Sequence, residues 1–196
     1  MQNINAVSTA PIPKVSLKKH IVQDARKRSD MFETHIHNWI QNFLSIPHAT
    51  FNNLPPCPFA KQALLDNKIQ CVEIKPYEHI SMHDYFIAEL ENFSYHWPKG
   101  KEVVVIGCEP CYISAVELSL ATETANNKFL YNRGYVALED HPDEKEQVQD
   151  VVLNNGLYAI IFLQQKEKLN TARTSLLKQS YYKNWDTEYY NEVTER

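Results

Sequence analysis

The sequence predicts a single α/β domain in which about four mostly parallel strands are flanked by helices. Short apolar runs rich in Val, Ile, Tyr and Phe alternate along the chain with segments whose apolar residues recur at helical spacing. The 196 residues are enough for one domain, and we find no internal repeat and no linker that would separate two. Alternating strands and helices favour a layered fold with a largely parallel sheet. An α+β ferredoxin-like arrangement is the alternative.

Three regions follow from composition and charge. Residues 1–28 are expected to form a flexible basic arm, because residues 1–30 carry a net charge of +4 whereas the remaining 166 carry −8. Residues 29–180 form the predicted domain. Residues 181–196 are a Tyr-rich tail, and so many aromatic side chains are expected to pack on the body or on a partner.

The first predicted element of the domain is an amphipathic helix. It begins after Ser29 or Asp30 and ends at Pro47, and its apolar face consists of Phe32, Ile36, Trp39, Ile40, Phe43 and Leu44. A proline-rich loop over residues 47–58 follows. A short helix is expected over residues 59–68, with Pro58 at its first position and Cys57 at the N-cap. The helix dipole would lower the pKa of a thiol placed there.

Four strands and four further helices complete the predicted domain. The strands are expected over residues 69–75, 102–107, 134–139 and 157–164. The helices are expected over residues 81–96, 113–126, 142–154 and 166–179. The continuous apolar run at residues 103–106 is typical of a strand that is buried on both faces. Ser114 and Glu117 have the spacing of a capping box.

Composition excludes several classes of protein. Apolar residues are 43% and charged residues 22%, which excludes a disordered chain. No apolar run reaches the roughly 18 residues of a membrane span, and the start does not resemble a secretory signal. The net charge of −4 disfavours nucleic acid as a partner. Four cysteines without a signal peptide favour a reduced, cytoplasmic protein.

The first candidate site is the segment from Gly107 to Tyr112. It follows the most apolar predicted strand and opens a predicted helix, and sites in parallel sheets lie at the carboxyl ends of strands. Cys108 and Cys111 have C-x-x-C spacing. This spacing suits either a nucleophilic thiolate with a resolving thiol, or half of a zinc or iron site.

Two local resemblances involve the cysteines, and the first of them implies thiol chemistry. The strand followed by Cys108-Glu109-Pro110-Cys111 resembles the active-site segment of thioredoxin-like proteins, which implies that Cys108 is the nucleophile and Cys111 the resolving thiol. The run from Cys57 to Lys61, Cys-Pro-Phe-Ala-Lys, resembles the motif of a small uncharacterised bacterial family. Members of that family carry a Trp-containing helix before the motif and, in some cases, a late His-Pro dipeptide. These correspond here to Trp39 and His141-Pro142, which implies that Cys57 and His141 lie near one pocket.

Another candidate site is Glu139-Asp140-His141, which closes the third predicted strand. One interpretation is helix capping, with Asp140 or His141 as the cap and the nearby acids complementing the dipole. The other is that these three side chains bind iron, manganese or zinc, or that His141 acts as a base. Cys57, Cys108, Cys111 and His141 together would form a Cys₃His zinc site or an imidazole-activated thiolate.

Three hypotheses about function remain open. The first is a small cytoplasmic redox or metal-dependent enzyme that acts on a small molecule or a protein thiol at the carboxyl edge of the sheet. The second is a non-enzymatic interaction protein, for instance a homodimer, that uses the basic arm and the aromatic tail while the cysteines are structural. The third is a small-molecule enzyme whose pocket is built from acids and aromatics with no role for cysteine. The four glycines form no phosphate-binding loop of the Rossmann or Walker type, so those cofactors are not expected.

Overall fold

The computed structural model describes residues 30–195. The predicted basic arm of residues 1–28 therefore lies outside the described residues, which begin in the helix that was expected to follow it. This helix spans residues 30–39 and continues as the π-helical turn η1 (Ile40–Leu44). Among the described residues, no helix combines the length and the apolar character needed to cross a membrane.

The centre of the fold is a four-stranded sheet in the order β1-β2-β6-β3. The strands are β1 (Ile69–Glu73), β2 (Val103–Cys108), β3 (Tyr135–Asp140) and β6 (Ala159–Gln165). β1 and β2 are parallel, whereas β6 runs antiparallel to both β2 and β3. The four strands are those expected from the sequence, but the sheet is mixed, whereas a mostly parallel one was predicted.

The direction of β6 follows from the segment before it. Residues 142–154 were predicted to be a helix, and a helix there would have carried the chain across for a parallel strand. They instead contain a small hairpin of β4 (Gln147–Val148) and β5 (Val151–Val152), with Gln149 at a positive φ of 55° in the turn. With no crossover helix, the chain turns back and β6 inserts antiparallel beside β3.

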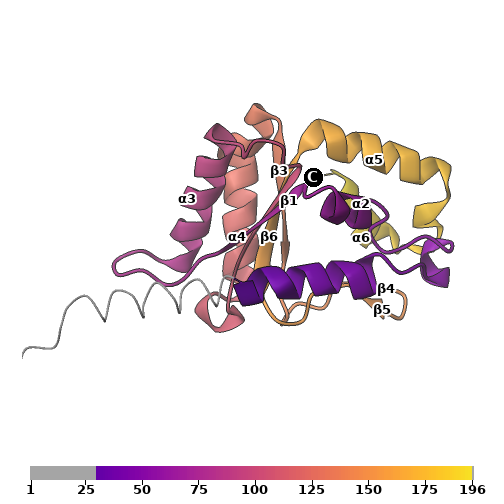
Figure 1. The fold of residues 1–196 in the computed structure, drawn as a ribbon, viewed down its shortest axis with the longest axis horizontal. Helices are drawn as coiled ribbons and strands as arrows, with labels where there is room; N and C mark the ends of the chain where they lie inside the picture. Colours follow the sequence, from indigo (N-terminus) through magenta and orange to yellow (C-terminus); the bar gives the residue numbers. More distant parts are fainter. Residues whose placement is uncertain (1–29, 196) are drawn as a thin grey trace, which may run out of the picture.

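Helices cover both faces of the sheet (Figure 1). The first face packs against α3 (Met82–Tyr95) and α4 (Ala115–Ala125). The second face packs against the helix of residues 30–44 and the short α2 (Ala60–Leu65). Side chains along β6 alternate between the two layers, as the pleat requires: Ile161 and Leu163 face α3 and α4, and Ile160 and Phe162 face the second layer.

Local sequence signals explain how α4 begins, and a buried asparagine after α4 contacts the edge of the sheet. Ser114 and Glu117 form the predicted capping box, with Ser114 Oγ accepting from the backbone N–H of Glu117. α4 continues into η4 (Asn126–Leu130) and η5 (Tyr131–Arg133). The buried amide of Asn126 donates to the carbonyl of Ala137 (2.9 Å) and accepts from its N–H (2.8 Å). This side chain therefore pairs with the outer edge of β3 as a neighbouring strand would.

The C-terminal part arches over the second face of the sheet. It consists of α5 (Lys166–Lys178), η6 (Tyr181–Asn184) and α6 (Thr187–Glu195). Aromatic side chains hold it to the body: Tyr181 stacks on Phe51 of η2 (Ala49–Phe51), with ring centroids 5.5 Å apart, and Trp185 meets the same ring edge-on. The aromatic residues of the tail thus contribute to a third apolar cluster.

A close approach at Gly107 generates the first prediction. A Cβ atom at this position would lie 2.6 Å from the ring of Phe32 and 2.8 Å from Ile160. We expect Gly107→Ala to lower the free energy of unfolding by about 1–3 kcal/mol through overpacking, measured by urea denaturation. Phe32→Leu provides the matched test, because a smaller side chain should relieve the clash. If the double variant lost as much free energy of unfolding as the two single variants added together, this explanation would be contradicted.

Candidate functional site

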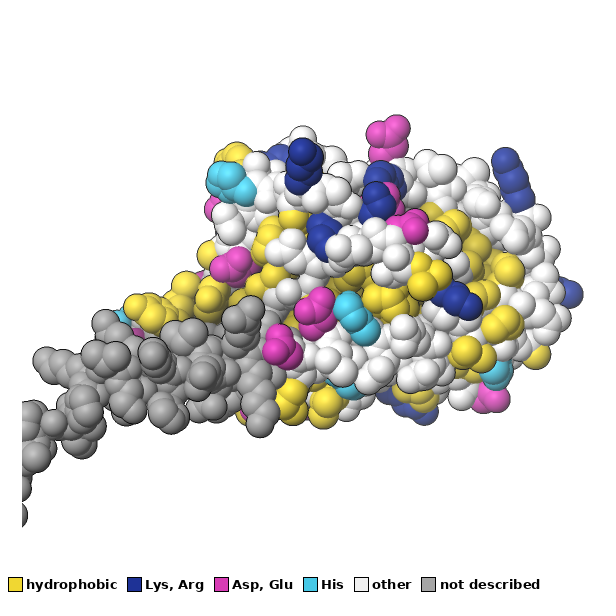
Figure 2. Space-filling view, in the orientation of Figure 1, with side chains coloured by type: hydrophobic (Ala, Val, Ile, Leu, Met, Phe, Trp, Pro, Cys, Tyr) yellow, Lys and Arg dark blue, Asp and Glu magenta, His cyan; other side chains and the backbone are white. Residues whose placement is uncertain are grey.

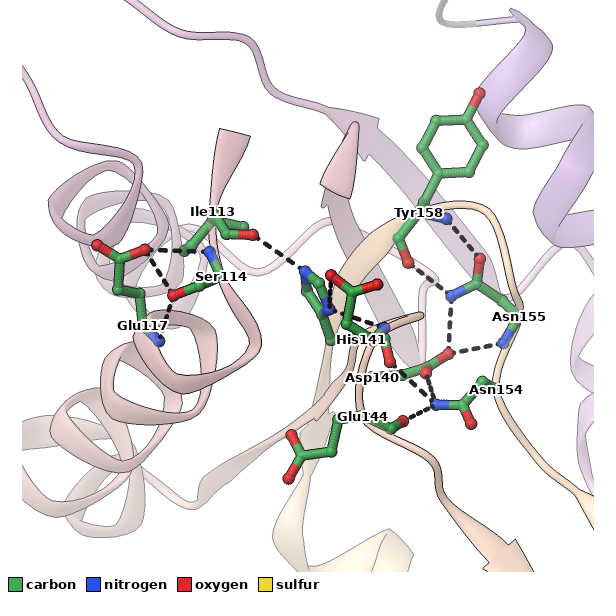
Figure 3. Close-up of polar contacts among 10 residues, drawn as sticks. Ile113, Ser114, Glu117, Asp140, His141, Glu144, Asn154, Asn155 and Tyr158 are labelled. Carbon is green, nitrogen blue, oxygen red and sulfur yellow. Dashed lines mark hydrogen bonds and ion pairs between the residues drawn. The ribbon is translucent and has the colours of Figure 1, made fainter. Parts of the chain in front are cut away.

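A buried carboxylate organises the carboxyl end of β3 (Figure 3). Asp140 is 4% exposed, and both of its oxygens accept hydrogen bonds. Oδ1 accepts from Asn154 Nδ2 (2.7 Å), and Oδ2 accepts from the backbone N and the Nδ2 of Asn155 (2.9 and 2.7 Å). Three donors compensate the buried charge, and they fix the two ends of the hairpin segment against each other.

The network extends through Asn155 to the N-terminal helix. Asn155 Oδ1 accepts from the backbone N–H of Tyr158 (2.8 Å), and Nδ2 donates to the carbonyl of Tyr158 (2.7 Å). His35 Nε2 donates to the carbonyl of Asn155 (3.2 Å), and its ring lies 5.3 Å from that of Tyr158. These bonds connect β3, the start of β6 and the helix of residues 30–39 in one hydrogen-bonded network around Asp140.

His141 belongs to the same hydrogen-bonded network, because its carbonyl accepts from Asn154 Nδ2. It is 2% exposed; Nδ1 accepts from the backbone N–H of Asp143 (3.1 Å), and Nε2 donates to the carbonyl of Ile113 (3.0 Å). The N–H of Asp143 donates to Nδ1, so the bond to the carbonyl of Ile113 uses a proton on Nε2. Both ring nitrogens are thus engaged. In this arrangement His141 holds the loop before α4 rather than offering a free nitrogen to a metal or a substrate.

The C-x-x-C pair is divided between the core and the surface. Cys108 is fully buried among the apolar residues under α3 and α4, and burial raises the pKa of its thiol to about 12. Cys111 is exposed in η3 (Pro110–Tyr112), a 3₁₀ turn that precedes α4. Its Sγ lies 3.9 Å from a carboxylate oxygen of Glu109. The charges of Glu109 and Glu73 also raise the pKa of Cys108, so its surroundings do not stabilise a thiolate.

Cys57 does not occupy the predicted N-cap. The N-cap of α2 is Phe59, two residues later, and α2 has only six residues. The pKa of the Cys57 thiol is raised by burial, which outweighs hydrogen bonding to the backbone of Ala60 and Phe59. The expected lowering of this pKa is therefore wrong, because loss of hydration opposes the charged form more strongly than the backbone amides favour it.

The predicted metal ligands are not assembled into one site. Within residues 30–195, no three His, Cys, Asp or Glu side chains are grouped so as to hold a metal ion. Glu139 accepts a hydrogen bond from Ser119 of α4 (3.0 Å), and Asp140 is saturated by the two asparagines. In the same part of the chain all four cysteines are free thiols.

A large cleft lies elsewhere, on the second face of the sheet. Its volume is about 1040 Å³, at the upper limit of the usual size of ligand sites. Its floor is formed by β2, β6 and β3, and its walls by η1 and α2 on one side and by α5 and α6 on the other. Figure 2 shows hydrophobic side chains gathered between α5 and the N-terminal helix. The apolar part of the lining includes Trp39, Leu44, Leu138, Phe162, Leu169 and Ala172.

Irregular backbone and aromatic rings shape one wall of the cleft. The helix of residues 30–39 widens into η1, whose Ile40 and Leu44 line the cleft. π-Helical turns of this kind are frequent at functional sites. Trp39 stacks on Phe162 of β6, with ring centroids 6.0 Å apart and an interplanar angle of 28°. The indole N–H of Trp39 is buried and has no hydrogen-bond partner.

Charged side chains lie at two ends of the cleft. At the amino ends of β1 and β2, Glu102 Oε1 lies 3.0 Å from Lys168 Nζ and 4.0 Å from Lys68 Nζ. At the end formed by the hairpin, Tyr189 of α6 donates to Glu146 (3.2 Å). The cleft thus combines an apolar middle with charged groups that are separated along its length.

The structure brings together only part of the predicted site. Cys57, Glu139 and Asp140 line the cleft, whereas Cys108 faces the opposite layer of the core. Phe162 and Lys168 also line the cleft, and neither is among the site residues predicted from the sequence. The alternation along β6 places Phe162 on the face opposite Ile161. No local pattern in the sequence, however, predicts that a cleft lies over this part of the second face.

The hydrogen-bonded network around Asp140 leads to a prediction about this residue. Asp140→Asn would present an amide group to donors that now meet carboxylate oxygens, and it would remove the charge that strengthens these bonds. We expect a loss of about 2–3 kcal/mol in the free energy of unfolding, measured by chemical denaturation. Asp143→Asn is the matched control because its side chain is 84% exposed. Equal stability of the two variants would refute the role of Asp140.

The cysteines lead to a prediction about reactivity. Because burial raises the pKa of the Cys108 thiol to about 12, this thiol stays protonated near pH 8. We expect one fast-reacting thiol per native chain toward an aromatic disulfide reagent, and four after denaturation. Cys111→Ser should remove the fast phase and Cys108→Ser should leave it. Fast modification that survives in Cys111→Ser and is lost in Cys108→Ser would reverse this assignment.

Known proteins add no indication of what this chain does. Comparisons with family models, with curated proteins and with solved structures find no match. The two local resemblances at Cys57 and Cys108 therefore remain predictions.

Proposed function

We propose that this protein binds an organic small molecule with a largely apolar body in the cleft between the second face of the sheet and α5 and α6. The observation that carries the proposal is the cleft itself, with a volume of about 1040 Å³ over a sheet face that is otherwise core. Concave, mainly apolar sites with a few polar groups are the usual form of small-molecule sites.

The two faces of β6 differ in a way that supports this proposal. Ile161 and Leu163, which face α3 and α4, are fully buried. Phe162 and Gln164, on the other face, are only partly buried and line the cleft. Burying an apolar side chain such as Phe162 contributes roughly 1.5–3 kcal/mol, so leaving it partly open forgoes stability that a bound ligand would restore.

The polar groups along the cleft would orient the ligand. Gln164 on the floor and Thr171 and Ser175 on α5 offer neutral hydrogen-bonding groups beside the apolar middle. Cys57 belongs to the wall, and burial keeps its thiol protonated because its pKa is raised. These groups suit recognition of a ligand, in line with the third hypothesis from the sequence, in which cysteine has no chemical role.

A substitution that fills the cleft tests the proposal. Ala172 of α5 lines the cleft, and a Trp side chain there would occupy the space that a ligand needs. We expect the wild-type chain to bind the neutral apolar dye Nile red with an increase in fluorescence. Ala172→Trp should weaken this binding at least about tenfold, the equivalent of 1.4 kcal/mol.

Leu177→Trp is the matched control for this experiment. Leu177 lies on the same helix, is 53% exposed and does not belong to the cleft lining. This variant should bind the dye as the wild type does, and both variants should keep the far-ultraviolet circular dichroism of the wild type. Absence of dye binding, or equal binding by the two Trp variants, would overturn the proposed function.

A further inference from the structure

The lining of the cleft carries an excess of negative charge, and we infer from this that its ligand is an organic cation, with an apolar body that ends in an ammonium group. The inference rests on the proposed function and adds the charge of the ligand and its orientation. The ammonium group is assigned to the hairpin end of the cleft, which is formed by the carboxyl end of β3, the segment around the hairpin and the start of α6.

The first argument is the balance of charges along the cleft. Seven acidic side chains line it against three lysines, so the lining has a net charge of −4. A cavity lined by an excess of one sign of charge raises the local concentration of ligands of the opposite sign. The charge of the lining therefore favours a cation and disfavours an anion.

The second argument is that the excess is confined to one end. At the amino ends of β1 and β2, Asp66 and Glu102 stand against Lys68 and Lys168, so this end is neutral. The hairpin end has a single lysine, Lys145. Its acidic lining residues are Glu139, Asp140, Glu144, Glu146 and Asp186. The charge distribution thus sets one orientation, with the cationic group of the ligand at the hairpin end.

Neutral groups hold several of these carboxylates in place. Glu139 accepts from the hydroxyl of Ser119 (3.0 Å), and Asp140 accepts from the amide of Asn155 (2.7 Å). Such hydrogen bonds stabilise the ionised form of a carboxylate and leave its charge in place. The charge of Asp140 is also buried, at 4% exposure, so salt and water screen it less than a surface charge.

The positive groups of the C-terminal segment do not reverse this balance. Asp186 Oδ1 accepts from the backbone N–H of Glu188 (2.8 Å) at the start of α6, where the helix dipole contributes only about half a positive charge. The guanidinium of Arg173 donates to the carbonyls of Val193 and Thr194, at the other end of α6. The hairpin end therefore keeps a clear excess of negative charge.

The third argument is the aromatic and apolar surface that accompanies the acids. Tyr189 lines the cleft at the hairpin end, and its ring stacks on Trp185 with centroids 5.3 Å apart. Aromatic rings attract ammonium groups through their π-electrons, which adds to the attraction of the carboxylates. Farther along the cleft, Phe162 and Leu169 offer dispersion contacts without charge. This arrangement suits a molecule with one cationic end and an apolar body.

The test is equilibrium dialysis of the full chain at pH 7 and low ionic strength with three ligands that share one hydrocarbon chain: octylamine, which is protonated at this pH, octanol and octanoate. We expect octylamine to bind more tightly than octanol, and octanoate to bind most weakly. Glu144→Gln should weaken octylamine binding about threefold, within the range of an exposed ion pair, and leave octanol binding unchanged. Added salt should reduce the preference for octylamine.

Asp143→Asn is the matched control, because it removes the same charge from the neighbouring residue, which is 84% exposed and does not line the cleft. It should leave octylamine binding unchanged. Tightest binding of octanoate, indifference to the head group, or equal octylamine binding by the Glu144→Gln and Asp143→Asn variants would each overturn the inference while leaving an apolar cleft in place. Failure of all three ligands and of Nile red to bind would refute the proposed function, and the inference with it.

Discussion

The fold depends on the buried carboxylate of Asp140, which holds the end of β3 to the start of β6. Its oxygens accept from Asn154 and Asn155, and Asn155 in turn accepts from and donates to the backbone of Tyr158. A buried charge is tolerated only when donors surround it, so the chain between β3 and β6 has to fold back on this group. The return without a crossover helix makes β6 antiparallel and places it between β2 and β3.

The position of the cleft follows from that reversal. Because β6 runs opposite to β3, it ends at the amino ends of the other strands, and α5 starts from there. α5, η6 and α6 then arch over the second face, where the helix of residues 30–44 covers only part of the sheet (Figure 1). Aromatic contacts of Tyr181 and Trp185 with Phe51 hold the arch in place and leave the space beneath it open.

The residues with the most reactive side chains serve mainly the architecture. His141 uses both ring nitrogens to fix a turn and the loop before α4, and Cys108 fills the core with a thiol whose pKa burial raises to about 12. The cleft is instead made of aliphatic, aromatic and amide groups, with both acidic and basic side chains at each of its two ends. A ligand of the kind proposed would be selected by the shape of this site and by its few polar groups.

Periodicity and local motifs determined the strands, most of the helices and the capping box at Ser114, because these depend on neighbours within a few residues. They failed at residues 142–154, where the Pro-Asp-Glu start of a helix is overridden by the contacts of Asp140 with Asn154 and Asn155. They failed again at Cys57, since the desolvation of a thiol depends on what packs over it. The direction of β6, the burial of the thiols and the existence of the cleft were decided only by the tertiary structure, because each depends on residues that are far apart in the chain.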